Sequence, residues 1–365
     1  AAGYAALRLV DSLLPPELRG LRGVEGSDQS FDLVKTLADL TALVRRSTLG
    51  PTTAALVAEA EARHIPVVRL NDQSLLRLGW GRRQKLLRAS ITGDTSLIAV
   101  ETAGDKNLAK TLLARAGLPV PAGTVVRSAD EAVAAATKIR GPVVTKPQDG
   151  NHGRGVSLDL RTPDEVRWGF DQAARHGRRV IVEQQYSGRD YRVLVINGQV
   201  VAVAERLAAQ VTGDGEKTVE ALVAAVNADP RRGAGHETVM TRIVIDDHVR
   251  ERLSREGLTP ESVPAAGQVV QLRATANLST GGAAIDRTDV IHPANALIAR
   301  RAAAVVGLDI AGIDFITPDI SKSALDLGGG IVEINAAPGF RMHLEPSEGR
   351  GRNVAKPVID MLFPG

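Results

Sequence analysis

Apolar positions recur along the chain with two different periods, which predict a mixture of helices and strands. Over residues 31–50 the apolar side chains return at helical spacing. Residues 51–70 predict a helix that opens at a proline and is followed by a short apolar strand. We expect residues 1–87 to form a small N-terminal α/β region ahead of a larger domain over residues 88–365.

The same patterns continue through the middle of the chain. A strand and a turn are expected at 77–91, and the helix that follows them ends at Gly117. Another helix, over 128–139, precedes the buried strand 141–147. The residues Thr-Pro-Asp-Glu at 162–165 have the composition of a capped helix start. Helices and strands therefore alternate in this part of the chain.

A hairpin and an insertion are predicted in the second half. Two alternating runs within 190–211 meet at Asn197-Gly198, a dipeptide typical of hairpin turns, so the sheet is expected to be antiparallel here. Residues from about 213 to 280 contain charged helices and turns and predict an inserted lobe. Strands return afterwards, around a helix at 294–308.

A glycine-rich loop lies in the stretch KPQDGNHGRGVSLDL, residues 146–160. Its glycines have the reverse order of the dinucleotide fingerprint, and the Walker lysine motif is missing, so neither a Rossmann turn nor a Walker loop is expected. Two strands that carry a glycine flap are the layout with which kinases cover nucleotide phosphates. Lys146 at the base of the flap and Lys106 further upstream are therefore candidate phosphate contacts, although a single lysine is most often a solvated surface residue.

Three polar residues near the C-terminal end predict a metal site. Glu333 and Asn335 lie two residues apart on a predicted strand and therefore point to the same face. Asp314 interrupts another apolar strand, where an unpaired carboxylate would be costly, so a partner is expected. Oxygen ligands without cysteine or a suitably spaced histidine pair favour Mg²⁺ over zinc. A salt bridge to an arginine is the alternative interpretation of Asp314 alone.

Two turns that contain glycine are candidate substrate sites. Arg273 precedes a turn whose side chains and backbone amides can donate to an anionic oxygen. The residues of this turn are Asn277, Ser279, Thr280, Gly281 and Gly282. Arg341 and His343 follow the predicted metal strand, where a guanidinium can hold a carboxylate with two hydrogen bonds. Turn chemistry alone would also explain the glycines in both places.

Composition narrows the functional classes. The chain has 365 residues, of which 44% are hydrophobic and 24% charged, a globular mixture. A net charge of +3 and 3% aromatic residues do not favour a nucleic-acid partner. The absence of cysteine excludes disulfides and thiolate catalysis. No apolar run reaches the length of a membrane span, so we expect a cytoplasmic protein without a membrane partner, truncated at its first residue, which is alanine.

The order of these features resembles that of the ATP-grasp carboxylate–amine ligases. The match runs over about residues 100–345 and includes both lysines, the flap, VEQQYSGRDYRV and the predicted metal residues. Longer strings, among them KPQDGNHGRGV, ATANLSTGGAAIDRTDVIHPAN and VEINAAPGFRMHLEPSEG, are similar to the cyanophycin synthetase branch of that family. The resemblance implies an α/β (α+β) ATP-grasp fold with a small N-terminal unit and an inserted lobe.

The resemblance also implies roles for individual residues, with ATP and Mg²⁺ as cofactors. The implied ATP-binding residues are Lys106, Lys146, His152, Gly153, Arg154, Gly155, Glu183, Gln184, Tyr186 and Asp190. Asp314, Glu333 and Asn335 would hold magnesium. The implied catalytic residues are Arg192, Arg273 and Arg341, which would stabilise an oxyanion or the incoming carboxylates. The turn at 277–282 and His343 would bind substrate.

In this family the C-terminal carboxylate of a poly-aspartate chain is phosphorylated, and the amino group of a new aspartate displaces the phosphate. The resemblance therefore implies aspartate and a poly-aspartate or cyanophycin-like acceptor as partners, and it leaves a homo-oligomer open. The chain ends at MLFPG, about where the family continues into a Mur-ligase-like domain, so arginine addition is not expected. Ala208 stands where proline is usual. The alternatives are a ligase for another amino acid, closer to glutathione synthesis, and an inactive nucleotide- or polymer-binding module.

Overall fold

The structure is a computed structural model and divides into two compact units. It describes residues 1–19, 31–139, 141–148, 155–233, 238 and 240–364. One unit consists of Ala1–Leu49 and Leu70–Gln73, and the other of Gly50–Arg69 and Ser74–Gly365. The domain boundary expected at residue 87 stays a prediction.

The smaller unit is helical. It contains α1 (Ala2–Leu13), the 3₁₀ helix η1 (Pro16–Leu18) and α2 (Leu33–Ser47). The helix predicted over 31–50 is thus confirmed as α2. None of the helices in the described parts of the chain is long and apolar enough to cross a membrane.

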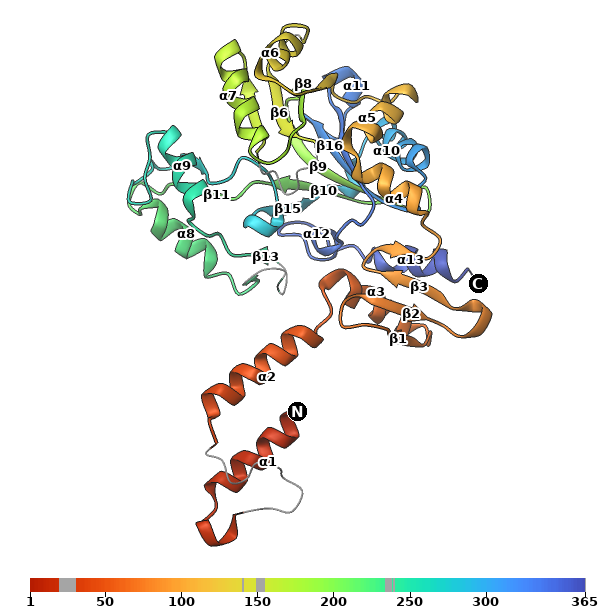
Figure 1. Ribbon diagram of the computed structural model, residues 1–365, viewed down its shortest axis with the longest axis vertical. Coiled ribbons are helices and arrows are strands. Elements are labelled where there is room, and N and C mark those ends of the chain that lie inside the picture. Colours follow the sequence, from red (N-terminus) through yellow and green to blue (C-terminus); the bar gives the residue numbers. More distant parts are fainter. Residues whose placement is uncertain (20–30, 140, 149–154, 234–237, 239, 365) are drawn as a thin grey trace. The chain divides into compact units, whose positions relative to one another are not determined.

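The larger unit begins with a helix and a small antiparallel sheet (Figure 1). Its first helix, α3 (Pro51–Ala62), starts at the predicted proline, whose fixed φ suits the first helical position. The strands lie in the order β1 (Val67–Arg69), β2 (Leu75–Leu78), β3 (Lys85–Arg88) and β4 (Ile91–Thr92), with the 3₁₀ helix η2 (Gly81–Arg83) between β2 and β3. Leucines of α3 and β2 share one core with the last helix, α13 (Ala355–Leu362).

A second antiparallel sheet carries the predicted glycine flap, and helices α6 (Ala129–Thr137) and α7 (Pro163–Ala174) pack on it (Figure 1). Its strands lie in the order β5 (Gly123–Val126), β8 (Val180–Gln184), β6 (Val143–Pro147) and β7 (Ser157–Leu160). The capping box predicted at α7 is present, because the Thr162 hydroxyl accepts the Glu165 amide and the Glu165 carboxylate accepts the Thr162 amide. We call this sheet and its two helices the flap subdomain.

The central sheet has five strands, and every neighbouring pair is antiparallel. Their order is β15 (Ala283–Asp286), β10 (Gln199–Leu207), β9 (Arg189–Ile196), β16 (Ile310–Thr317) and β17 (Gly330–Asn335). The predicted hairpin at Asn197-Gly198 joins β9 to β10, and both turn residues have positive φ. A bulge between Val200 and Ala202 then shifts the register by one residue.

The two faces of the central sheet differ. Three helices cover one face and bury Val193, Ile313 and Phe315: α4 (Leu97–Gly104), α5 (Lys106–Arg115) and α10 (Pro293–Val306) (Figure 1). On the opposite face, Leu194 and Ile196 of β9 pack in the core formed by α3 and α13. Since alternate residues of a strand point to opposite faces, Asp190 and Arg192 share this second face at the other end of β9.

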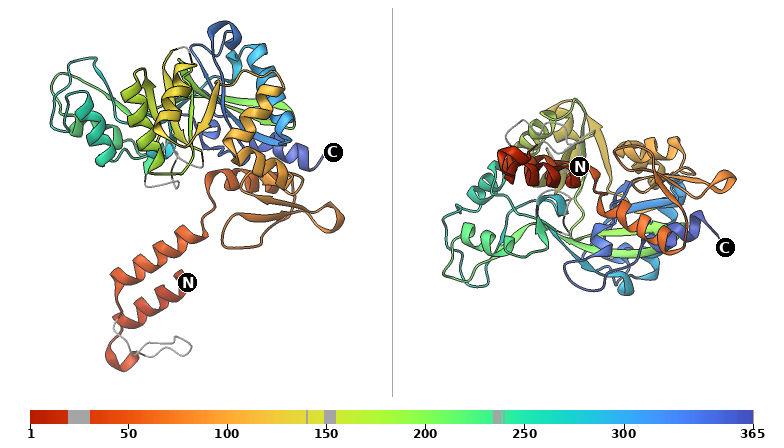
Figure 2. Two further views of the ribbon diagram at one scale, coloured as in Figure 1. Left: turned by 45° about the horizontal axis from the view of Figure 1, so that its top comes forward. Right: turned by 90° about the horizontal axis from the view of Figure 1, so that it is seen from below.

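The segment between β10 and β15 forms a lobe with a hydrophobic core of its own. The lobe contains β11 (Gln210–Thr212), α8 (Val219–Asn227), β12 (Arg232–Gly233), β13 (Met240–Thr241), α9 (Asp247–Arg255) and β14 (Val269–Gln271). Figure 2 shows it in green and teal from two further directions. Its exact limits, expected at about 213 and 280, stay a prediction. The remaining short helices are η3 (Leu278–Thr280), η4 (Thr288–Val290), α11 (Ala324–Leu327) and α12 (Arg341–Leu344).

Candidate active site

The polar end of the central sheet brings charged residues together from four strands. Directly opposed residues of antiparallel strands point to the same face, so the register determines this cluster. Asp314 of β16 lies opposite Arg192 of β9 on one side and opposite Glu333 of β17 on the other. Arg206 of β10 lies opposite Asp190, two residues before Arg192. These five charged side chains therefore share one face of the sheet.

Asp314 is the centre of a buried ion-pair network. Its carboxylate accepts a hydrogen bond from Nε of Arg192 and lies 3.1 Å from Nη2 of Arg206, which is also 2.6 Å from Asp190. Burial disfavours the charged form of Asp314, but the two arginines more than offset this and lower its pKa. Burial raises the pKa of Asp190, against the attraction of Arg206 and with added repulsion from Asp314. The expectation that Asp314 requires a partner is confirmed.

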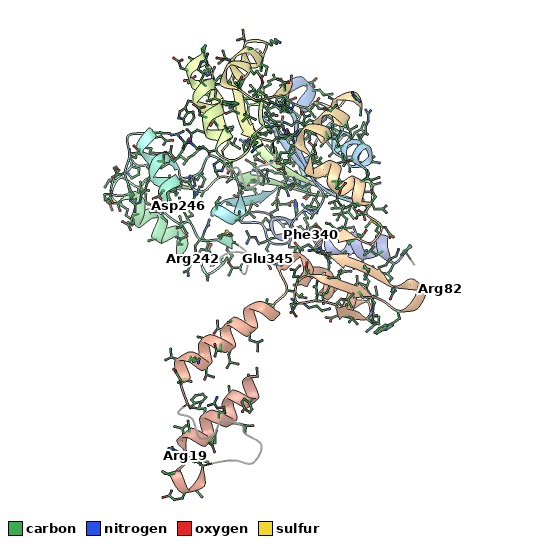
Figure 3. All side chains as sticks on the ribbon, in the orientation of Figure 1. Arg19, Arg82, Arg242, Asp246, Phe340 and Glu345 are labelled. Atoms are coloured by element: carbon green, nitrogen blue, oxygen red, sulfur yellow. The ribbon has the colours of Figure 1, made fainter. Side chains whose placement is uncertain are left out.

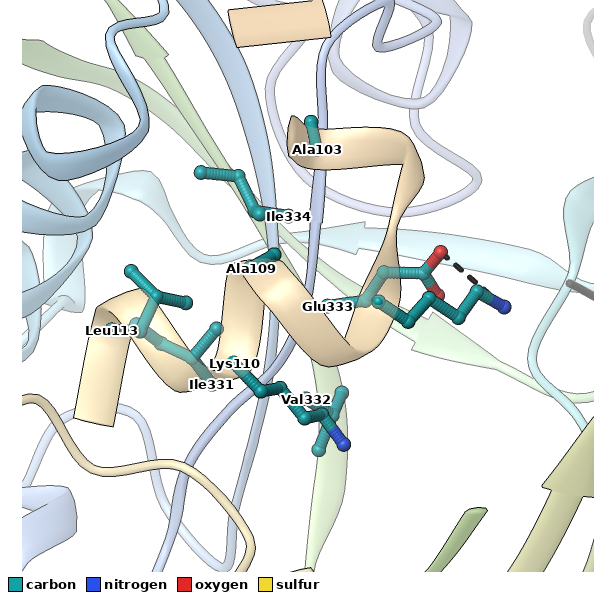
Figure 4. Close-up of a pocket in the computed structure, with 9 residues that line it drawn as sticks. Ala103, Ala109, Lys110, Leu113, Ile331, Val332, Glu333 and Ile334 are labelled. Carbon is teal, nitrogen blue, oxygen red and sulfur yellow. Dashed lines mark ion pairs between the residues drawn. The ribbon is translucent and has the colours of Figure 1, made fainter. Parts of the chain in front are cut away.

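Glu333 and Asn335 extend this charged face along β17. Nζ of Lys106, the first residue of α5, lies 3.7 Å from Oε1 of Glu333 (Figure 4). The side-chain amide of Asn335 donates to the carbonyl of Gly312 at 3.3 Å. Lys106, Lys110 and Glu333 line a pocket between α5 and β17 whose other walls are mostly apolar (Figure 4). In the structure, the predicted phosphate contact Lys106 thus forms an ion pair with the predicted metal ligand Glu333.

The chemistry of this donor set fits a hard divalent cation. Carboxylate and amide oxygens are the ligands that Mg²⁺ prefers, and Asp314, Glu333 and Asn335 share a face. Glu333 is more accessible than Asp314, with 35% of its side chain exposed. Asp314 is held by two arginines and would have to exchange one of them for a cation. Within the described residues, no group of three or more His, Asp or Glu side chains is arranged to hold a metal ion, so the magnesium assignment stays a prediction.

A second charged cluster lies on the flap subdomain, around the buried carboxylate of Glu183 on β8. Nζ of Lys146, on β6, is 2.6 Å from Oε1 of Glu183. Lys110 of α5 donates to the other carboxylate oxygen, Oε2. The two predicted ATP-binding residues Lys146 and Glu183 are thus brought together, with a third residue that the sequence analysis did not select. We call these three residues the lysine triad.

Burial and mutual charge set the pKa values of the lysine triad. Burial lowers the pKa of Lys110 to about 7, and the neighbouring charge of Lys146 contributes in the same direction. Burial also disfavours the charge of Lys146, but Glu183 more than offsets it and raises the pKa. For Glu183, burial is outweighed by Lys146 and Lys110, which lower its pKa. Lys110 is therefore the member of the triad that titrates near neutral pH.

The other predicted nucleotide contacts lie next to this triad along the chain. Gln184 ends β8, and its backbone amide donates to the carbonyl of Ala122 at 2.8 Å. Burial, with a contribution from Glu183, raises the pKa of Tyr186 to about 12, so its phenol stays protonated. Gly155 precedes β7 with a φ of +70°. The flap residues His152, Gly153 and Arg154 lie outside the described residues.

The predicted substrate turn is closed by its own backbone. Asn277 precedes η3 and Ser279 lies within it. The amides of Thr280 and Gly282 donate to the carbonyl of Asn277, and the amide of Gly281 donates to that of Leu278. Gly281 has a φ of +96°, and a Cβ there would lie 2.6 Å from a side-chain carbon of Ile243. The turn therefore requires its glycines for conformation and packing, and the substrate-binding role stays a prediction.

Arg341 connects the start of α12 to the inserted lobe. It donates to the carbonyl of Thr238 at 3.0 Å and to the hydroxyl of Thr241 at 3.3 Å. The buried Arg232 of the lobe donates to the carbonyls of Thr241 and Gly281, at 2.7 and 3.0 Å. Two arginines thus hold together β13, the predicted substrate turn and the segment that follows β17.

Two other predicted residues, Arg273 and His343, lie in an ion pair of the inserted lobe and in a buried position, respectively. Asp246 lies at the start of α9 in the inserted lobe (Figure 3). Arg273 is paired with it at 2.7 Å. His343 is only 3% exposed, and its Nε2 has no hydrogen-bond partner among the residues that the structure describes. Burial and then the charge of Arg192 lower the pKa of His343 to about 3, so it is a neutral imidazole. Their catalytic and substrate-binding roles stay predictions.

The sequence analysis missed three residues that the structure places in these clusters: Lys110, Arg206 and Arg232. Lys110 follows Lys106 by four residues, which places both on one helix face, so a signal was present. Arg206 faces Asp190 only because of the bulge in β10. Arg232 donates to backbone carbonyls, an interaction that has no sequence signature.

Comparison with known proteins defines the class of the fold. Residues 103–216 match the RimK-like ATP-grasp domain. A bifunctional glutathione synthetase from Pasteurella multocida has a similar structure, with a TM-score of 0.67 and 32% identity over 87% of this chain and 44% of that one. The protein therefore has the ATP-grasp fold of a ligase, and this prediction is confirmed.

The sequence relatives are more specific. The chain is 50% identical to the cyanophycin synthetase of Geminocystis herdmanii and 49% identical to that of Crocosphaera subtropica, over all of this chain and 41% of each relative. The glutathione biosynthesis bifunctional protein of Mannheimia succiniciproducens is 33% identical over 98% of this chain and 48% of its own length. The chain is thus similar over its whole length to cyanophycin synthetases, and it spans about two fifths of their length.

Proposed function

We propose that the protein is an ATP-dependent carboxylate–amine ligase that adds aspartate to the C-terminal carboxylate of a poly-aspartate, cyanophycin-type backbone. One observation carries this proposal: carboxylates and cations from β9, β10, β16 and β17 share the polar end of one sheet face, next to the pocket between α5 and β17. Cyanophycin synthetases of 49–50% identity support the choice of substrate.

The reaction runs through an acyl phosphate because a carboxylate is a poor acyl donor. The acceptor carboxylate attacks the γ-phosphorus of ATP, its new bond to phosphorus replaces the bond to ADP, and ADP leaves. The amino group of aspartate then attacks the acyl carbon, inorganic phosphate departs, and the amine loses a proton as the peptide bond forms. The protein supplies no nucleophile, so its residues bind, orient and stabilise charge.

The residues of the two charged clusters divide this work. Lys106 and Lys146 bind phosphate oxygens, where ammonium groups offset the negative charge. Asp314, Glu333 and Asn335 would hold magnesium, which when bound adds positive charge beside the transferring phosphate. Arg192 stabilises the oxyanion at the acyl carbon, and Arg341 holds a substrate carboxylate through its guanidinium. The glycine flap that the sequence predicts would exclude water, which would otherwise hydrolyse the acyl phosphate.

A direct assay tests the proposal. Purified protein is incubated with ATP, Mg²⁺, an aspartate oligomer with or without arginine side chains, and each amino acid in turn. Phosphate release and product mass are then measured. We expect aspartate-dependent ADP formation and a product heavier by one aspartyl residue. ADP formation only with another amino acid would show that the substrate is not aspartate. The 33% identity to a glutathione biosynthesis protein makes this the alternative to test. Nucleotide binding without turnover would contradict the ligase assignment.

A further inference from the structure

The lysine triad contains more positive than negative charge. Two ammonium groups, of Lys110 and Lys146, donate to the two oxygens of one carboxylate, that of Glu183. The side chains of both lysines are only 13% exposed, and that of Glu183 only 5%. Glu333 also attracts Lys146, but its own ion pair is with Lys106. Among the described residues, the protonated triad therefore has one positive charge without a paired carboxylate in a poorly solvated place, where it costs free energy.

The fold brings the three residues together from separate elements. Lys146 is on the same face of the sheet as Glu183, diagonally across from it, because Val144 is the residue directly opposite Glu183. Glu183 packs directly against Gly123 of β5, and a larger residue there would clash, since a Cβ on Gly123 would lie 2.5 Å from the Cβ of Glu183. Lys110 comes from α5, one turn after Lys106, so α5 holds Glu183 with one lysine and Glu333 with another.

We infer that Lys110 is a positioning residue for nucleotide binding: it holds the carboxylate of Glu183, so that the charge of Lys146 stays available to the phosphates of ATP. This inference rests on the proposed function, since it assumes that ATP occupies this site. Without Lys110, Lys146 would be the single counter-ion of a buried carboxylate, and an arriving phosphate would have to break that pair. With Lys110 present, Glu183 keeps a cation when Lys146 turns to the ligand.

Two further observations fit this role. The small pocket between α5 and β17 is lined by both Lys106 and Lys110, so the two lysines of α5 reach the same cavity beside Glu333 (Figure 4). The depressed pKa of Lys110 is what a surplus buried cation should have, because burial and Lys146 both oppose its charge. An anion bound nearby would favour its protonated form.

The test measures dissociation constants of adenosine, ADP and ATP for the wild type, Lys110→Met, Glu183→Gln and the double variant. Lys110→Met removes the surplus charge, so we expect ATP to bind at least about tenfold more weakly, ADP to be affected less, and adenosine to stay within about twofold. Adding Glu183→Gln to Lys110→Met leaves Lys146 without its competing carboxylate. The double variant should therefore recover ATP binding to within about threefold of wild type.

The recovery separates positioning from a merely structural role. If Lys110 only stabilised the fold, the two substitutions would add, and the double variant would bind ATP more weakly than either single variant. Unchanged ATP affinity in Lys110→Met would also overturn the inference. Circular dichroism shows that each variant is folded, and unaltered adenosine binding adds this evidence for Lys110→Met. Lys138→Met, at the exposed lysine that follows α6, is the matched control. Wild-type protein that binds no ATP would refute the proposed function instead.

Discussion

The two charged clusters of the larger unit differ in their balance of charge. Around Asp314, the carboxylates of Asp190 and Asp314 face the guanidinium groups of Arg192 and Arg206. Around Glu183, one carboxylate faces two ammonium groups. Both clusters are buried, so the difference is not one of solvent access. The balanced network is satisfied within the protein, whereas the lysine triad gains most when an anion arrives.

The two clusters also differ in their cations, which are arginines around Asp314 and lysines around Glu183. A guanidinium stays protonated at any pH that a folded protein tolerates, and its planar donors suit a fixed pair. Burial lowers the pKa of Arg206, but Asp314 and Asp190 reverse this and raise it above its usual range. An ammonium group loses its proton more readily, and the pKa of Lys110 is lowered to about 7. Arginines thus hold three strands together, while lysines provide a charge that responds to a ligand.

The largest expected effect comes from unbalancing the arginine network. Asp314→Asn leaves Arg192 and Arg206 facing each other with one carboxylate instead of two, so the free energy of unfolding should fall by about 3–5 kcal/mol, and ADP formation should be lost. Urea unfolding followed by circular dichroism measures the first effect, and a coupled ADP assay the second. A variant as stable as the wild type would show that the network adds nothing to stability.

The next variant lies on β17, beside the arginine network, and tests the metal side of the site. Glu333→Gln removes the charge of a partly exposed carboxylate with one pair at 3.7 Å. We expect the free energy of unfolding to change by less than about 0.5 kcal/mol. Turnover should fall by about a thousandfold, because the magnesium ion that would offset charge on the transferring phosphate loses a charged ligand, while adenosine still binds. The exposed Glu345, after α12, provides the control variant Glu345→Gln, which should keep full turnover.

Unchanged turnover in Glu333→Gln would remove this residue from the metal site. In that case Asp314 would have to provide the carboxylate that holds magnesium, although two arginines already hold it. The variant therefore decides whether the balanced network also has a catalytic part.

The elements of both clusters were largely predictable from the sequence, because each depends on local chemistry. The proline that opens α3, the capping box of α7 and the Asn197-Gly198 turn act within a few residues of chain. Alternation along β17 likewise predicted that Glu333 and Asn335 share a face. These features need no knowledge of the tertiary fold.

The charge balance was not predictable, because it depends on register and on contacts between distant elements. Counting outward from the hairpin turn places Glu205 opposite Asp190, but the bulge after Val200 shifts the pairing and places Arg206 there. The lysine triad joins α5 to β6 and β8, and its two lysines, Lys146 and Lys110, precede Glu183 by 37 and 73 residues. Such pairings are decided by packing.

The pH dependence of ATP binding sharpens the contrast between lysine and arginine. Among the described residues, Glu183 and Lys146 are the charged groups that most affect Lys110, and Lys106 and Glu333 line the same pocket. In the free protein Lys110 is protonated below pH 7 and loses its proton above it, so the triad keeps its surplus charge at pH 6 and loses it at pH 9. The advantage of the wild type over Lys110→Met should therefore shrink from about tenfold at pH 6 to about twofold or less at pH 9.

The ratio of dissociation constants is the quantity to measure by calorimetry, because the titration of ATP itself affects both proteins equally and cancels. A ratio that stays constant from pH 6 to pH 9 would show that protonation of Lys110 does not contribute to binding. The arginine network should add no slope in this range, since the pKa of Arg206 is raised and that of Asp314 is lowered.

The smallest expected effect tests whether loosening the flap subdomain alone imitates the loss of Lys110. Thr162→Ala removes the acceptor for the Glu165 amide at the start of α7 and should lower the free energy of unfolding by about 1 kcal/mol. The exposed Thr137, whose hydroxyl donates to the carbonyl of Val133 inside α6, provides the control Thr137→Ala, with a change below about 0.5 kcal/mol. Neither variant should change ATP affinity, because neither alters a charge. If Thr162→Ala weakened ATP binding as much as Lys110→Met does, the lysine triad would act through the stability of its sheet and not through its surplus charge.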